Sequence, residues 1–305
     1  MSYTFLFPGQ GSQKVGMGAG ILAQSTFAQS QFKKASEILG FDLAKIVLEG
    51  PDEDLKKTEF TQPALFVLEA VLTDMLKEKG LSPVTTMGHS LGEYSALYAA
   101  GVFSFEDGVK LVGKRGALMA AAGASSNGTM AAIIGMDKDD IVTTLTKVTS
   151  GVVVSANENA PDQTVISGEV AAVEEACELL KQAGAKRAII LAVSGAFHSP
   201  LMRTAAEEFE LFLNDITFND ATVPVITNVT AQPEQSGARL KALLVEQLLS
   251  PVRWVDAQKT LLESGNSSCI EVGPGNVLKG LARKYSRDIK VVSCSDSEGL
   301  EALTN

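Results

Sequence analysis

The sequence predicts an α/β protein with an α/β-hydrolase-like core, a mainly parallel sheet and an inserted ferredoxin-like small domain. Three observations support this prediction. Short β-rich runs alternate with longer helical patterns in both outer parts of the chain, which is typical of a parallel sheet covered by helices. The middle of the chain follows a different order, βαββαβ. A serine between two glycines stands where a strand is expected to run into a helix.

The outer parts supply the elements of the main sheet. At the start, a strand is predicted at YTFLF (3–7), a helix at 61–79, a strand at 84–87 and a helix at 93–100. Near the end, β-rich runs recur as VPVITNV (223–229), SCIEVGPG (268–275) and IKVVSC (289–294). Strands separated by helices of this length predict parallel pairing.

The middle region predicts a unit of its own. Strands are expected at 128–136, 151–159, 163–168 and 186–193, with helices at 137–148 and 170–184. These strands would otherwise extend the main sheet, but two complete split βαβ halves favour a separate unit. The predicted boundaries are residues 127–196 for the small domain and residues 1–126 with 197–305 for a discontinuous large domain.

Composition narrows the classes of partner. The 305-residue chain is 45% hydrophobic and has a formal net charge of −10, which argues against nucleic acid or an anionic membrane as the main partner. No apolar run reaches the roughly 18 residues of a membrane helix, and the N-terminus lacks the basic segment of a signal peptide. A cytoplasmic location is therefore expected.

The cysteines and histidines argue against a metal site. Cys177, Cys269 and Cys294 have neither metal-binding nor redox spacing, so free thiols in a reducing compartment are expected. Only two histidines occur, which excludes a site built from several histidines, and the carboxylates show no recognisable metal-binding spacing.

Ser90 is the candidate nucleophile. Gly88–Gly92 reads GHSLG and matches the G-x-S-x-G nucleophile elbow, in which a strained strand-to-helix turn exposes the serine hydroxyl. The expected strand before it and helix after it fit this context. A helix-capping serine is the simpler alternative. The backbone N–H of Leu91 would lie at the helix start, where it could stabilise an oxyanion.

His198 is the candidate base for that serine. His89 is adjacent to Ser90, but neighbouring side chains at a strand end point in opposite directions, so His89 is expected to pack beneath the elbow. His198, in SGAFHSPLM, follows the last strand of the predicted insert, although a loop or capping role is also open. No acidic partner can be chosen among 36 acidic residues, and a carbonyl oxygen would orient the imidazole equally well.

Two further features complete a candidate site. The glycine-rich turn FPGQGSQ (7–13) follows the first strand and could direct backbone N–H groups into a cleft, although such turns are common. Arg115 lies among small residues on a predicted helix. Most arginines are solvated surface charges, but one in this setting could bind a carboxylate with two hydrogen bonds.

Taken together, these motifs resemble the malonyl-CoA:acyl carrier protein transacylase family over nearly the whole chain. The order and spacing of the motifs carry the resemblance: FPGQGSQ (7–13), TQPAL (61–65), GHSLGEYSAL (88–97), KRGALM (114–119), NENAPDQTVISG (157–168), SGAFHSPLM (194–202), EQLLSPVRW (246–254) and EVGPGNVLKGL (271–281).

The resemblance implies a ping-pong acyl transfer. Ser90, activated by His198, would take a malonyl group from malonyl-CoA and pass it to the phosphopantetheine thiol of acyl carrier protein. No cofactor is implied to remain bound. The remaining roles implied by the resemblance are an oxyanion hole from the backbone amides of Gln10 and Leu91, a carboxylate partner in Arg115, and a histidine-orienting main-chain carbonyl at Gln247.

The resemblance also bears on selectivity. Phe197, directly before the histidine, is the residue type found in relatives that take malonyl rather than methylmalonyl groups, although it could simply pack the domain junction. An acidic carrier would need a basic patch on this acidic chain, for which the candidates are Lys186, Arg187, Lys279, Arg283 and Lys284.

Two alternative functions remain. A serine esterase or thioesterase would use the same elbow, but typical α/β-hydrolases place the histidine near the C-terminus and after an acid. An acyltransferase of a polyketide pathway shares the chemistry. A chain that starts at Met1 without an attached ketosynthase or carrier segment favours the free-standing enzyme of fatty acid synthesis.

Overall fold

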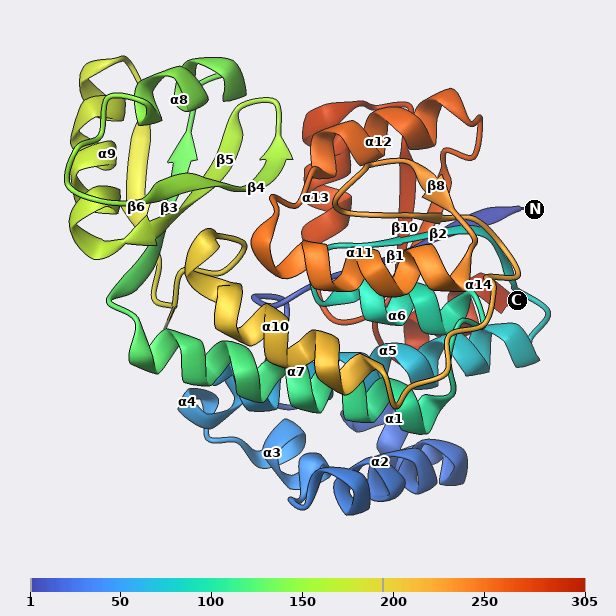
Figure 1. Ribbon diagram of the computed structural model, residues 1–305. Coiled ribbons are helices and arrows are strands. Elements are labelled where there is room, and N and C mark those ends of the chain that lie inside the picture. Colours follow the sequence, from blue (N-terminus) through green and yellow to red (C-terminus); the bar gives the residue numbers. More distant parts are fainter. Residues whose placement is uncertain (1, 194, 305) are drawn as a thin grey trace.

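Two β-sheets of different kinds organise the protein, as seen in the computed structural model, which describes residues 2–193 and 195–304 (Figure 1). Within these residues the larger sheet has the strand order β10-β9-β1-β2-β7-β8. All its neighbours pair in parallel except β7 and β8, which are antiparallel. Its strands are β1 (Tyr3–Phe7), β2 (Pro83–Gly88), β7 (Val225–Ile226), β8 (Pro233–Glu234), β9 (Ser268–Val272) and β10 (Lys290–Cys294).

Alternating side chains of the parallel strands enter two hydrophobic cores. On β1, Phe5 and Phe7 pack into the core that contains buried residues of the helices α5 (Thr58–Glu78), α6 (Gly92–Ala99) and α7 (Phe105–Ser125). Leu6 packs into the core that contains Trp254 of α12 (Trp254–Glu263) and Leu281 of α13 (Val277–Tyr285). This alternation is the two-residue period of a strand buried on both faces. Helices therefore cover both faces of the sheet (Figure 1).

Local sequence signals mark several helix starts in the larger part. Ser25 accepts the N–H of Ala28 at the start of α2, and Ser104 accepts that of Asp107 at the start of α7, as N-cap residues do. The helices of this part are α1 (Ala19–Gln24), α2 (Thr26–Leu39), α3 (Leu43–Glu49), α4 (Asp52–Leu55), α5 (Thr58–Glu78), α6 (Gly92–Ala99), α7 (Phe105–Ser125), the 3₁₀ helix η1 (Pro200–Met202), α10 (Arg203–Leu213), α11 (Gly237–Leu249), α12 (Trp254–Glu263), α13 (Val277–Tyr285) and α14 (Ser297–Thr304).

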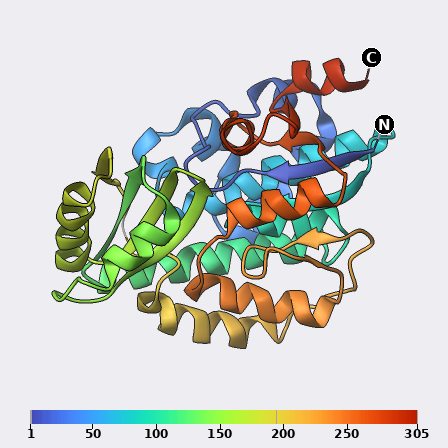
Figure 2. The same cartoon turned by 90° about the horizontal axis from the view of Figure 1, so that it is seen from above.

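The second sheet is antiparallel throughout and lies to one side of the larger part (Figures 1 and 2). Its strand order is β4-β5-β3-β6. The elements of this unit are β3 (Gly128–Ile134), α8 (Lys138–Leu145), β4 (Val153–Ala160), β5 (Gln163–Glu169), α9 (Val170–Gln182) and β6 (Arg187–Ile190). The protein is thus a mixed α/β fold with a mostly parallel sheet and a separate antiparallel sheet, as the element order predicted.

The two faces of the antiparallel sheet have different surroundings. Ala131, Ile133 and Ile166 pack against α8 and α9 in a separate core. Met130 and Val165, from the opposite face, line a cavity toward the larger part. The last strand, β6, ends at Ile190 and is shorter than the predicted run 186–193; Leu191 and Val193 beyond it line this cavity.

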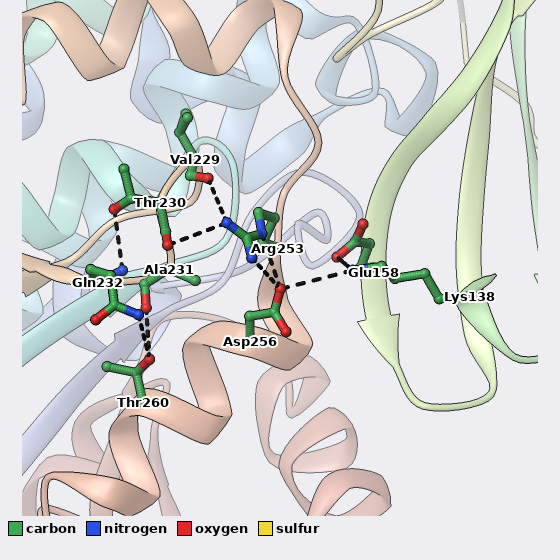
Figure 3. A network of polar contacts seen from close by, with 9 residues as sticks. All are labelled: Lys138, Glu158, Val229, Thr230, Ala231, Gln232, Arg253, Asp256 and Thr260. Atoms are coloured by element: carbon green, nitrogen blue, oxygen red, sulfur yellow. Dashed lines mark hydrogen bonds and ion pairs between the residues drawn. The ribbon is translucent and has the colours of Figure 1, made fainter. Parts of the chain in front are cut away.

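The segment before α12 joins the two parts of the molecule. Val252 pairs with β4 by two backbone hydrogen bonds, to Ala156 at 2.8 Å and from Glu158 at 2.9 Å. Lys138 of α8 lies 2.9 Å from the Glu158 carboxylate and 3.9 Å from that of Asp256 on α12 (Figure 3). This network ties the antiparallel unit to the rim of the parallel sheet.

In the residues that the structure describes, no helix combines the length and the apolar character needed to cross a membrane.

Candidate active site

Ser90 lies in a sharp turn between β2 and α6. Its φ of 52° is in the left-handed region, which is rare for residues other than glycine and marks a strained turn. A Cβ atom on Gly88 would overlap the backbone of Gly92, and one on Gly92 would overlap the Phe7 carbonyl. Only glycine at both positions lets β1, β2 and α6 approach this closely, so the turn has the geometry of a nucleophile elbow.

His198 is hydrogen-bonded to Ser90. Its Nε2 lies 2.7 Å from Ser90 Oγ, and its Nδ1 lies 2.8 Å from the main-chain oxygen of Gln247. Because a carbonyl oxygen only accepts, Nδ1 carries the proton and Nε2 is free to accept the serine proton. His198 also has a left-handed backbone, with φ of 56°. The pair has the donor and acceptor pattern of a serine and its general base.

The surroundings of His198 keep the imidazole neutral. Burial, followed by the nearby positive charge of Arg115, lowers the pKa of His198 to about 3. The hydrogen bond to the Gln247 carbonyl opposes this shift without cancelling it. At neutral pH the imidazole is therefore in the form that accepts a proton.

Arg115 lies beside the serine from α7. Its side chain is only 1% exposed, and Nη2 donates to Ser90 Oγ at 3.2 Å and to Gln247 Oε1 at 2.9 Å. The guanidinium carbon lies 5.2 Å from the centre of the Tyr94 ring, a cation–π contact. Its Nε has no hydrogen-bond partner within the described part of the chain. A buried guanidinium in this state is suited to bind a carboxylate.

The side chains of Asn228, Glu93 and Gln247 connect the parts of this site. The sequence did not indicate Asn228 or Glu93, and it indicated Gln247 only for its main-chain carbonyl. Asn228 accepts the Ser90 N–H at 2.7 Å and donates to the Gly88 carbonyl at 2.6 Å. Glu93, 2% exposed, accepts the Asn228 N–H at 3.2 Å and the side-chain amide of Gln247. Two sequence features could have indicated these residues: Glu93 directly follows GHSLG, and Asn228 ends the β-rich run VPVITN.

A cavity of about 310 Å³ opens onto Ser90 between the two sheets. Among its lining residues are Gln10 from the loop after β1 and Leu91 at the start of α6. Within residues 2–193 and 195–304, the backbone N–H groups of both residues donate to no acceptor. Two free N–H groups beside a serine hydroxyl are the donors that an oxyanion hole requires. Phe197 and Met119 add apolar walls.

The other sequence-predicted residues form different contacts or are exposed. His89 Nε2 is bound to Asn159 Oδ1 at 2.7 Å, and its ring packs against Trp254 at 5.4 Å, so it is engaged away from the Ser90 hydroxyl. The five basic candidates for carrier docking are all exposed, and Lys284 donates to Gln163 at 2.7 Å. Ser194, the first residue of the SGAFHSPLM motif, lies outside the described residues.

The described residues contain no cluster of three or more histidine, cysteine or acidic side chains that could hold a metal ion. Cys177, Cys269 and Cys294 are buried and unpaired, and burial raises the pKa of each thiol. A serine, a histidine and an arginine thus supply the reactive groups around the cavity, and their arrangement suits acyl transfer to and from a serine.

Comparisons with known proteins point to one family. The acyl transferase domain family matches residues 4–295. The malonyl CoA-acyl carrier protein transacylase of Bacillus subtilis is 46% identical over 97% of this chain and 94% of that protein. Its counterpart in Haemophilus influenzae is 44% identical over 99% of this chain and 97% of that protein.

Solved structures show the same similarity. An acyl carrier protein S-malonyltransferase from Vibrio cholerae superposes with a TM-score of 0.96 at 41% identity, covering 99% of this chain and 100% of that one. A malonyl-transacylase in complex with its type II PKS acyl-carrier protein superposes with a TM-score of 0.95 at 40% identity, covering 99% and 98%. With near full-length coverage on both sides, the chain belongs to the malonyl CoA-acyl carrier protein transacylase family.

Proposed function

We propose that this protein transfers a malonyl group from malonyl-CoA to the phosphopantetheine thiol of acyl carrier protein, through an ester on Ser90. One observation carries the proposal: a buried Arg115, free to bind a carboxylate, lies 3.2 Å from the oxygen of a serine that is paired with a neutral histidine. A malonyl thioester is an acyl group that ends in a carboxylate. The names of the relatives, malonyl CoA-acyl carrier protein transacylases, support the same substrate.

In the first half-reaction, Ser90 attacks the thioester carbonyl of malonyl-CoA. His198 Nε2 takes the Oγ proton as the new C–O bond forms, and the carbonyl oxygen becomes an oxyanion. The N–H groups of Gln10 and Leu91 stabilise this oxyanion. The intermediate then collapses by breaking the C–S bond, and the proton on Nε2 passes to the leaving thiolate, which departs as CoA.

The second half-reaction repeats these steps with a different thiol. The phosphopantetheine thiol of the carrier gives its proton to His198 and attacks the malonyl ester. The ester C–O bond breaks, and His198 returns the proton to Ser90 Oγ. Throughout, the Gln247 carbonyl accepts a hydrogen bond from Nδ1–H, which keeps the imidazole in the tautomer that both half-reactions need.

The walls of the cavity account for the choice of acyl group. Arg115 binds the free carboxylate of malonate, which an acetyl group lacks. Phe197, 6% exposed and lining the cavity, occupies space that an α-methyl branch would require. We therefore expect malonyl-CoA to be preferred over both acetyl-CoA and methylmalonyl-CoA.

The exposed basic residues fit an acidic carrier. Lys279 and Arg283 lie on α13, a helix whose Val277 and Leu278 line the cavity, so a carrier bound there would be close to Ser90. Lys186 and Arg187 at the start of β6, together with Lys284, are the other candidates. This basic surface would allow an acidic carrier to bind a protein whose net charge is −10.

We also propose a division of the chain into two domains and a cytoplasmic location. The order β4-β5-β3-β6 and the βαββαβ sequence of elements support a ferredoxin-like small domain at residues 127–196. Residues 1–126 and 197–305 would form the α/β-hydrolase-like large domain. We place the enzyme in the cytoplasm, where its free cysteines stay reduced, with no resident cofactor and with fatty acid synthesis as the pathway served.

A transfer assay with competing donors tests the proposal. Purified protein is mixed with malonyl-, methylmalonyl- or acetyl-CoA and phosphopantetheinylated acyl carrier protein, and acyl-carrier and free acid are quantified. Malonyl transfer much faster than malonate release supports the proposal. Release of malonate with no transfer identifies a thioesterase instead. Carriers from a fatty acid and a type II polyketide system, compared side by side, identify the pathway.

A further inference from the structure

Glu93 is a buried carboxylate directly behind the candidate active site. It lies in the first turn of α6 and is 2% exposed. Its Oε1 accepts the Asn228 N–H at 3.2 Å, and its Oε2 accepts the side-chain amide of Gln247. Burying a carboxylate costs free energy unless hydrogen bonds satisfy it, so a glutamate kept at this position requires a reason.

Donor and acceptor chemistry fixes the orientation of the Gln247 side chain. Arginine only donates, so the side-chain oxygen of Gln247 must face Arg115 Nη2, 2.9 Å away. The NH₂ group must then face acceptors. It faces the Ser90 carbonyl at 3.0 Å and the Glu93 carboxylate. The contact with Glu93 thus determines which end of the amide is presented to Arg115.

The main chain of Gln247 acts on the other half of the site. Its carbonyl oxygen lies 2.8 Å from His198 Nδ1, so this one residue contacts the arginine and the histidine and also hydrogen-bonds the serine backbone. A group that holds Gln247 in place therefore affects all three.

We propose that Glu93 is a positioning residue, which fixes the side-chain amide of Gln247 and thereby sets the direction of Arg115 and supports the carbonyl that orients His198. The inference rests on the proposed function, because Arg115 is taken there as the partner of the malonyl carboxylate. His198 Nδ1 is bonded to a main-chain carbonyl rather than to an acid, and Glu93 supplies a carboxylate one residue further away, acting through Gln247.

The variant Glu93→Gln tests this role. The glutamine amide has one accepting oxygen where the carboxylate has two, so the NH₂ group of Gln247 and the N–H of Asn228 compete for it. If the new NH₂ group faces Gln247, two donors meet, and rotation of the Gln247 amide would turn its NH₂ group toward Arg115, which also only donates. If it faces the Asn228 N–H, Asn228 is displaced, and its Oδ1 lies 3.5 Å from the same Gln247 NH₂ group. Both arrangements disturb the Gln247 amide and its hydrogen bond to Arg115. We expect kcat/KM for malonyl transfer to fall about 10- to 100-fold. The ratio of malonyl to acetyl transfer should fall as well, since acetyl transfer does not use Arg115.

A double-mutant cycle and a matched control separate positioning from general stability. In a Gln247→Ala background the link is already absent, so adding Glu93→Gln should change kcat/KM by no more than about twofold. The control is Glu69→Gln, which alters an equally buried glutamate on α5 that lies outside this network. It should leave the malonyl-to-acetyl ratio unchanged.

The outcomes are distinct. The proposal is overturned by a native ratio in folded Glu93→Gln, by an undiminished effect in the Gln247→Ala background, or by an equal fall in Glu69→Gln. If Glu93→Gln does not fold, Gln247→Ala tests the same link, and a native ratio in that variant also overturns it. Failure of the wild-type protein to transfer malonyl groups at all refutes the proposed function, and this is measured before any variant.

Discussion

Ser90 Oγ and His198 Nε2 lie 2.7 Å apart, although the two residues are separated by 108 positions in the sequence. Both have backbones in the left-handed region, a strained conformation for residues other than glycine. Hydrogen bonds stabilise both conformations: Asn228 accepts the Ser90 N–H, and the Gln247 carbonyl accepts from His198 Nδ1.

Replacing Ser90 with alanine should remove the side chain to which the malonyl group becomes attached. We expect Ser90→Ala to lose both malonyl transfer and the covalent malonyl-protein adduct, while the protein stays folded. The measurement is intact-protein mass spectrometry after incubation with malonyl-CoA. An adduct that persists in the variant would assign the nucleophile to another residue.

Replacing Arg115 with alanine should remove the carboxylate partner. A charge-assisted hydrogen-bonded pair contributes about 1.5–3 kcal/mol, so kcat/KM for malonyl-CoA should fall about 10- to 150-fold. Acetyl transfer should fall less, because an acetyl group has no carboxylate. Competition between the two donors measures the ratio, and Arg115→Lys serves as the control that keeps the charge but not the planar geometry. Unchanged malonyl selectivity would contradict the assigned role.

The buried, neutral His198 predicts a specific dependence of stability on pH. Its pKa is about 3 in the folded protein and near 6.5 when unfolded, so between these values the unfolded state binds more protons. The contribution of His198 to stability is therefore complete above pH 6.5 and is lost as the pH falls toward 3. The slope is about 1.4 kcal/mol per pH unit within this window.

Urea unfolding of the wild-type protein and of His198→Gln between pH 7.5 and 4.5 measures this effect. The wild-type protein should lose stability relative to the variant as the pH falls. Ser90→Ala keeps both histidines and is the control, so it should follow the wild-type slope. Parallel curves for the wild type and His198→Gln would mean that His198 does not titrate in this way.

Asn228 should stabilise the strained elbow. Asn228→Ala leaves the Ser90 N–H and the Gly88 carbonyl without their partner, and unsatisfied buried groups cost about 1–3 kcal/mol each. We expect a loss of about 2–4 kcal/mol in the free energy of unfolding and a clear fall in kcat. Asn228→Asp keeps the acceptor for the Ser90 N–H, so its free energy of unfolding should lie between those of the wild type and Asn228→Ala. Native stability of the alanine variant would show that the elbow is held by other contacts.

The ion pair between Lys138 and Glu158 should contribute more than an exposed pair does. The Glu158 side chain is 6% exposed, so Lys138→Ala leaves a nearly buried carboxylate without its cation. We expect a loss of about 1–3 kcal/mol in the free energy of unfolding. Lys34→Ala breaks a pair whose side chains are 45% and 43% exposed and should cost less than about 1 kcal/mol. Equal effects in the two variants would contradict this interpretation.

Local patterns in the sequence determined the types of element and indicated Ser90 as the candidate nucleophile. The alternation of strands and helices, the βαββαβ order and the glycines around Ser90 all act over short distances, where backbone sterics and side-chain periodicity decide the outcome. The helix predicted at 61–79 is α5, Thr58–Glu78, and the run 84–87 is β2, Pro83–Gly88. Several predicted runs are longer than the elements observed: the run 186–193 ends as β6 at Ile190, and the run 223–229 contains only β7, Val225–Ile226, as a strand. The ends of strands depend on tertiary pairing more than on local propensity.

The tertiary structure alone decided how the site is assembled and held. The loops after β1, β2 and β7 meet at the carboxyl ends of parallel strands, which brings Gln10, Ser90 and Asn228 together from distant parts of the chain. No local pattern indicates that Glu93 contacts Gln247, since 154 positions separate the two residues. Nor does a local pattern indicate that no carboxylate among the described residues forms an ion pair with Arg115, because burial and pairing depend on every element that packs around a side chain. The sequence indicated the candidate reactive groups, and the fold determined their hydrogen bonds, their burial and, through that burial, their charge states.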